Sequence, residues 1–152
     1  MISKQALIYL FHLFIVGPLL ILIGYNQAIS SDPELPSQSW AYSLLVFFGV
    51  MALAWHAYLY YTERPPINDK HFMINMIHIL FGVLFIYIGR KQMGTSPLSR
   101  NNWLFYLLLT LGILIMGWHG YLLWKLYKLG ILFIAENYRN MSVGMAVNSN
   151  KR

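Results

Sequence analysis

The sequence contains no cysteine and few charged residues. Of its 152 residues, 11% are charged, whereas soluble domains average about 25%. The lack of cysteine excludes disulfides, iron–sulfur clusters, thiolate metal sites and dithiol redox chemistry. Hydrophobic residues make up 58% of the chain. A soluble fold of this size cannot bury that much apolar surface, so a lipid bilayer must cover the rest.

Four segments have the length and composition of membrane-spanning helices. Each has about 20 mostly apolar residues, and none contains Asp, Glu, Lys or Arg. They are expected at residues 6–25, 41–62, 72–89 and 103–124. The first could instead be a signal peptide, but its apolar stretch is long and no small-residue cleavage site follows. We therefore expect an all-α, polytopic membrane protein with a four-transmembrane-helix bundle.

Basic residues are distributed unequally between the two sides of the membrane. The N-terminus, the second loop and the C-terminal tail share one side, which carries Lys4, Arg64, Lys70, Lys125, Lys128, Arg139, Lys151 and Arg152. The other side carries Arg90, Lys91 and Arg100. The positive-inside rule then predicts that both termini are cytoplasmic. These basic residues flank the spans, so the expected partner is the lipid bilayer rather than nucleic acid. Assembly of the chain into a homo-oligomer is a further possibility.

The two halves of the chain resemble each other. The second and fourth segments align without a gap at Trp40/Trp103, Gly49/Gly112, Trp55/Trp118, His56/His119 and Tyr58/Tyr121. The first and third match at Gly17/Gly82, Gly24/Gly89 and Gln27/Gln92. A hairpin crosses the membrane twice, so two consecutive hairpins have the same orientation. We therefore interpret the chain as a tandem parallel repeat with a pseudo-twofold axis along the membrane normal. The alternative interpretation is chance similarity between apolar helices.

One pair of histidines is out of phase in this alignment. Five residues lead from His12 to Gly17, but four lead from His78 to Gly82. An extra residue turns the preceding part of an α-helix by about 100° unless a bulge absorbs it. Pro18 removes the hydrogen bond to the Phe14 carbonyl and crowds that group. The sequence therefore predicts a bulge between His12 and Gly17 that keeps His12 on the expected face.

The domain organisation follows from the repeat. Residues 1–139 form the membrane domain, with repeat one at about 5–62 and repeat two at about 71–125. Residues 126–139 are expected to extend the last helix and turn onto the membrane surface, because the segment is too short for a fifth crossing. Residues 140–152 are expected to be a disordered polar tail.

Two strings in the sequence support a family resemblance. HLFIVGPLLILIGY and GWHGYLLW resemble segments of small duplicated membrane proteins encoded by large nucleocytoplasmic DNA viruses of algae and protists. The resemblance would extend to about residue 124. It implies a viral origin and a location in a host or virion membrane, and it implies no particular function.

Each spanning segment carries one histidine at a similar depth. Counted at 1.5 Å per residue from the segment midpoints, all four lie about 4–8 Å to the cytoplasmic side of the midplane. They are His12, His56, His78 and His119. An imidazole facing hydrocarbon leaves a donor and an acceptor unpaired, so the four are expected to converge in one layer inside the bundle. Interhelical hydrogen bonding alone is the alternative.

Four glycines form a second expected layer, slightly outside the midplane. They are Gly17, Gly49, Gly82 and Gly112. Glycine lets a flat ligand approach a backbone, or lets two helices approach each other, and both interpretations stay open. Asn75 precedes His78 by three residues and shares its face, so it is expected to hydrogen-bond an imidazole.

The histidine layer predicts a cofactor or metal site. Haem b is the first candidate, ligated by the diagonal pair His12/His78 or His56/His119, with the glycines making room for the porphyrin. A zinc or copper ion held by all four histidines is the alternative ligand. A histidine-gated proton or cation channel, with Trp55 and Trp118 as gates, is the second hypothesis. A structural scaffold without a cofactor is the third.

The spans contain no recognisable hydrolytic or transferase constellation. We find no Ser/His/Asp set, no paired carboxylates and no phosphate-binding glycine loop in these segments. An enzyme of these classes is therefore not expected, whereas electron transfer would follow if haem were bound.

Overall fold

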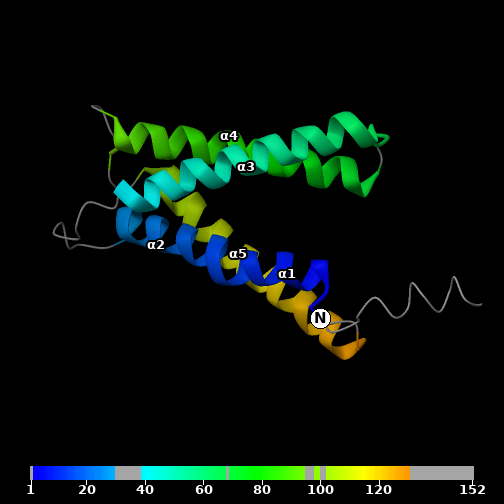
Figure 1. The fold of residues 1–152 in the computed structure, drawn as a ribbon. Helices are drawn as coiled ribbons and strands as arrows, with labels where there is room; N and C mark the ends of the chain where they lie inside the picture. Colours follow the sequence, from blue (N-terminus) through cyan, green and yellow to red (C-terminus); the bar gives the residue numbers. More distant parts are fainter. Residues whose placement is uncertain (1, 30–38, 68, 95–97, 100–101, 131–152) are drawn as a thin grey trace, which may run out of the picture. The chain divides into compact units, whose positions relative to one another are not determined.

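The computed structural model describes residues 2–29, 39–67, 69–94, 98–99 and 102–130. Every regular element within these ranges is a helix (Figure 1). The elements are α1 (Lys4–Phe11), η1 (His12–Val16), α2 (Gly17–Ala28), α3 (Ser39–Glu63), α4 (Lys70–Met93) and α5 (Trp103–Lys128). The predicted all-α class is confirmed.

Four helices are long and apolar enough to cross a membrane. They are Lys4–Ala28, which comprises α1, η1 and α2, and then Ser39–Glu63, Lys70–Met93 and Trp103–Lys128. Between 11% and 33% of the most apolar window of each helix is buried in the structure. A bilayer is therefore needed to cover the remaining apolar surface, which identifies the chain as a membrane protein.

Local sequence explains where several helices begin and end. Ser3 accepts a hydrogen bond from the Ala6 N–H and caps α1, and Asp69 accepts one from the His71 N–H and caps α4. Helix α5 ends at Lys128, and Gly130 follows with a φ of 67°. The predicted extension at 126–139 thus begins as a continuation of α5. Its remainder and the expected tail at 140–152 lie outside the described residues.

The chain divides into two compact units, and each is described by itself. One unit comprises Leu22–Leu108 and contains α3 packed along α4 (Figure 1). The other comprises Met1–Ile21 and Leu109–Arg152. In this second unit, α1, η1 and the start of α2 contact α5 through side chains and glycine backbones.

The predicted bulge in the first spanning helix is present. Residues His12–Val16 form a π-helical segment, and the Gly17 N–H donates to the His12 carbonyl, five residues earlier. A π-helical turn holds one residue more than an α-helical turn. Pro18 has no N–H to restore the α-helical bond to Phe14, which explains why the segment lies here. The additional residue is thereby absorbed before Gly17.

A pair of single-residue deletions tests this role of η1. Deleting Phe14 removes the extra residue of the π segment, so we expect the free energy of unfolding to change by about 1 kcal/mol or less. Deleting Leu80 from the regular helix α4 rotates His78 by about 100° away from its contacts, and we expect a loss of about 3 kcal/mol.

The two deletions are matched because Phe14 and Leu80 are 67% and 66% exposed and pack little within the chain. Detergent-induced unfolding of the purified variants measures the difference. Equal losses in the two variants would contradict the proposed role of the π segment.

Candidate functional site

Two histidines face each other between α3 and α4. The rings of His56 and His78 are stacked, with centroids 4.1 Å apart and planes inclined by 22°. His78 Nδ1 donates to the Ile74 carbonyl at 2.8 Å. His56 Nδ1 lies 2.9 Å from Asn75 Oδ1 on the neighbouring helix. Both rings are half-buried and each has an oxygen partner at Nδ1.

Asn75 is the one polar residue of α4 that the structure buries deeply. It is 3% exposed, and the imidazole that it contacts is that of His56. Its Nδ2 is buried without a hydrogen-bond partner among the described residues. An unsatisfied buried amide costs about 1–3 kcal/mol. The α3–α4 pair therefore holds an unused donor next to its imidazoles.

A second histidine pair lies between the first spanning helix and α5. The rings of His12 and His119 are stacked, with centroids 4.4 Å apart and planes inclined by 9°. His12 Nδ1 donates to the Ile8 carbonyl at 2.8 Å, and His119 Nδ1 donates to the Ile115 carbonyl at 2.9 Å. The ring geometry of this pair thus resembles that of the first.

Tyr9 is a site residue that the sequence analysis missed. Its ring centroid lies 5.6 Å from that of His119. Tyr9 precedes His12 by three residues, as Asn75 precedes His78, so the repeat contained the signal. Equivalent positions therefore place a phenol beside one imidazole pair and an amide beside the other.

The hydrogen bonds define the tautomer of the rings. A carbonyl oxygen only accepts, so the Nδ1 atoms of His12, His78 and His119 carry hydrogen. The amide oxygen of Asn75 is also an acceptor, so Nδ1 of His56 is likewise assigned the hydrogen. In a neutral ring of this kind the lone pair is on Nε2. Any proton or metal ion must therefore be taken up at Nε2.

The four glycines bring the paired helices into backbone contact. A Cβ added to Gly49 would lie 2.7 Å from the Gly82 carbonyl oxygen, and one added to Gly82 would lie 2.8 Å from the Gly49 oxygen. In the other unit, a Cβ on Gly112 would lie 2.8 Å from the Gly17 oxygen. The facing backbone thus occupies these positions. Within each pair, close helix packing accounts for the glycines, and they do not provide room for a porphyrin there.

The neighbours of the glycines also correspond between the two units. Ile86 lies against Gly49 where Ile21 lies against Gly112, and Leu53 lies against Gly82 where Met116 lies against Gly17. These residues occupy matching positions in the sequence repeat. The internal contacts of the two helix pairs therefore correspond, and the superposition of the complete hairpins stays a prediction.

The structure brings the predicted histidines together two by two. His12 contacts His119, and His56 contacts His78. The predicted single layer and the diagonal ligand pairs stay predictions. Trp55 and Trp118, the expected gates, are 58% and 60% exposed and lie on outer faces of their helices. Among the described residues, no group of three or more His, Cys, Asp or Glu side chains is arranged to hold a metal ion.

Comparison of the chain with protein-family models, with curated proteins and with solved structures yields no match. The viral resemblance of the two short strings therefore stays a prediction, and the functional argument rests on the imidazole pairs.

Alanine substitutions test the glycine contact. In Gly82→Ala the added methyl would lie 2.8 Å from the Gly49 oxygen and 3.0 Å from the Leu53 nitrogen. These are backbone atoms of the facing helix, so the helices must separate, and we expect a loss of about 1–3 kcal/mol in detergent unfolding.

Gly117→Ala is the matched control, because nothing lies within 4 Å of its added methyl. It should leave stability unchanged or raise it by up to about 1 kcal/mol through helix propensity. A neutral Gly82→Ala would show that the close contact does not hold the pair together.

Proposed function

We propose that the chain is a proton-responsive membrane protein whose two imidazole pairs bind protons under mild acidification. The observation that carries the proposal is the stacking of the rings at 4.1 Å and 4.4 Å in the two units, with an oxygen partner at each Nδ1. Because Nδ1 already donates, a proton adds at Nε2. An unperturbed imidazole titrates near pH 6.5, which makes histidine the side chain suited to a response near neutral pH.

The close approach of the rings limits each pair to one proton at first. Two positive charges about 4 Å apart repel each other by about 4 kcal/mol at an effective dielectric constant of 20. The second proton therefore requires that the rings separate or that water enters between them. The protonation state of a pair is thus coupled to the distance between its helices.

The glycine contact determines where this response occurs. Gly49 and Gly112 precede the histidines of their helices by seven residues, or two helical turns. They hold each helix pair together at that level while charge accumulates at the histidine level. The polar neighbours differ, since Asn75 lies beside His56 and Tyr9 beside His119. The two pairs are therefore expected to respond at different pH values.

The proposed orientation has both termini in the cytoplasm. It is supported by the eight basic residues assigned to that side, against three on the other. The imidazole pairs then lie in the cytoplasmic half of the membrane, and the proton source to which they respond is the cytoplasm.

Nitrogen-15 NMR of the histidine side chains in lipid vesicles tests the proposal. We expect the rings of each pair to take up their protons in two separate steps as the pH is lowered, because the first charge opposes the second. In the double variant His78→Phe and His119→Phe, the remaining His56 and His12 should each titrate in one step.

A functional assay in the same vesicles completes the test. If the response opens a path for ions, conductance of the parent protein should rise as pH falls through about 6–7 and should not rise in the double variant. Four rings that titrate independently, or that stay neutral throughout, would contradict the proposal. A purely structural role predicts that the phenylalanine substitutions change stability alone.

Binding of haem b is the second candidate, and the Nδ1 hydrogen bonds favour it. Ligating imidazoles commonly donate Nδ1–H to a carbonyl, which directs the Nε2 lone pair to the metal. Two imidazoles that bind one iron from opposite sides, each with an iron–nitrogen bond of about 2 Å, would have their ring centres about 6 Å apart. The stacked rings are closer, at 4.1 Å and 4.4 Å, so as they stand the two rings of one pair do not both ligate the same iron.

Absorption spectroscopy decides between the candidates. A haem protein purified from its membrane should show a Soret band, and His78→Ala should remove or shift it. Metal analysis of the same sample tests the zinc and copper alternative. A colourless, metal-free protein whose histidines titrate in two steps would leave proton binding as the function.

A further inference from the structure

Helix α5 carries a ladder of exposed aromatic rings. Trp118 and Tyr121 lie 6.1 Å apart between ring centroids, and Tyr121 and Trp124 also lie 6.1 Å apart. The three side chains are 60%, 50% and 55% exposed. Their spacing of three residues places them along one face of the helix. Neighbouring rings are tilted by 39° and 32°, and together they form a row of exposed aromatic surface along the helix.

Two cations lie at the end of this ladder. Lys128 Nζ is 5.8 Å from the Trp124 ring centroid. Lys125 lies one turn from Tyr121 on the same side of the helix, and both lysines are exposed. Helix α5 contains no acidic residue. The end of the ladder therefore carries two positive charges without a carboxylate on the same helix.

The ladder and the two lysines that follow it together cover a distance comparable to one leaflet of a bilayer. Ten residues lead from Trp118 to Lys128, which corresponds to about 15 Å along the helix. This is half of the hydrocarbon thickness of about 30 Å. By the count from the segment midpoint used above, Trp118 lies about 7 Å to the cytoplasmic side of the midplane. The rings therefore continue from there toward the membrane surface, and the two lysines follow beyond them.

We propose that Trp118, Tyr121, Trp124, Lys125 and Lys128 form a binding site for an anionic phospholipid. The acyl chain lies along the ring faces, which are rigid and lose little entropy on contact. The phosphate and the anionic headgroup contact the two ammonium groups. A basic residue near the membrane surface contributes about fivefold in affinity for anionic lipid.

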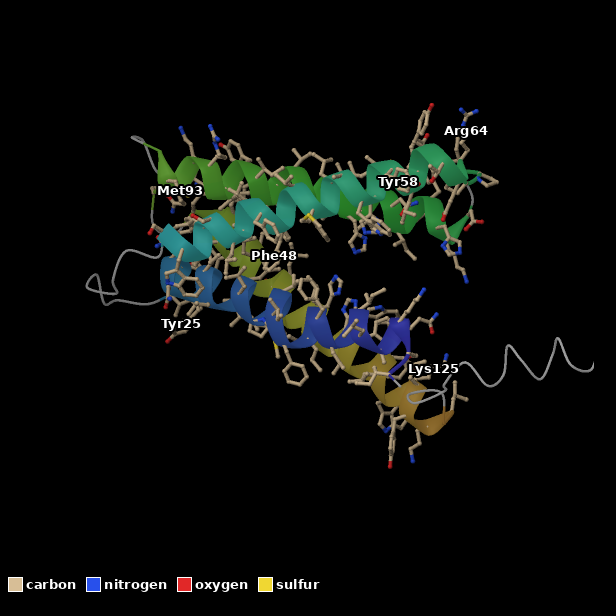
Figure 2. All side chains as sticks on the ribbon, in the orientation of Figure 1. Tyr25, Phe48, Tyr58, Arg64, Met93 and Lys125 are labelled. Carbon is tan, nitrogen blue, oxygen red and sulfur yellow. The ribbon has the colours of Figure 1, made fainter. Side chains whose placement is uncertain are left out.

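Helix α3 provides an internal comparison. Trp55 and Tyr58 lie 6.2 Å apart, and the Arg64 guanidinium lies 5.7 Å from the centroid of Tyr61, which continues the row. Figure 2 shows Tyr58 and Arg64 toward one end of α3 and Lys125 toward the end of α5. Glu63 adjoins Arg64, so this row has one cation beside one carboxylate. It should bind anionic lipid more weakly than the row on α5.

Quenching of tryptophan emission by brominated lipids tests the proposal on the full chain in vesicles. A variant with Trp40, Trp55 and Trp103 changed to Phe keeps Trp118 and Trp124 as reporters. We expect brominated phosphatidylglycerol to quench these more strongly than brominated phosphatidylcholine. Lys125→Gln with Lys128→Gln should reduce the preference by about fivefold for each lysine removed.

Controls separate the headgroup contact from other causes. Arg64→Gln should leave the preference at Trp118 and Trp124 unchanged, and a variant that keeps only Trp55 should show a weaker preference. Millimolar inorganic phosphate should not compete with the lipid, and competition would show a site for free phosphate. Equal quenching by both lipids would overturn the proposal. Weak quenching by both lipids, together with cross-linking between copies at Tyr121, would show that the ladder packs against a second copy of the chain and would also overturn the proposal.

Discussion

Backbone contact between glycines sets the spacing of each helix pair. At Gly49 and Gly82, and at Gly17 and Gly112, a single added carbon would meet a carbonyl oxygen of the facing helix. This spacing brings the helices near enough for the imidazoles further along to stack at about 4 Å. Larger residues at the glycine positions would move the rings apart, and each would lose its aromatic partner in a region where water is scarce.

The π segment makes this arrangement possible in the first spanning helix. His12 is one residue farther from its glycine than His78 is, yet both rings stack on a histidine of the facing helix. The bulge absorbs the difference because it adds a residue without turning the helix face away. The first spanning helix thus accommodates the additional residue in one irregular turn, with the His12 and Gly17 contacts to α5 on either side of it.

The two pairs are alike in packing but differ in chemistry. One has the amide of Asn75 beside His56, with a buried nitrogen that lacks a partner among the described residues, and the other has the Tyr9 ring beside His119. A change at one position of the repeat therefore alters the polarity around the imidazoles and leaves the helix contact intact. The polar neighbours of the imidazoles thus differ between the two pairs, whereas the glycine contacts correspond.

The sequence by itself determined the four spans, the level of the histidines along their helices and the bulge before Gly17. These features depend on hydropathy, on the rise of 1.5 Å per residue and on the missing N–H of Pro18, which are local properties. Only the tertiary structure decided that His12 stacks on His119 and His56 on His78, and that glycine contacts close the helix pairs. Periodicity defines the face and depth of a residue, but the partner depends on packing between helices far apart in the chain.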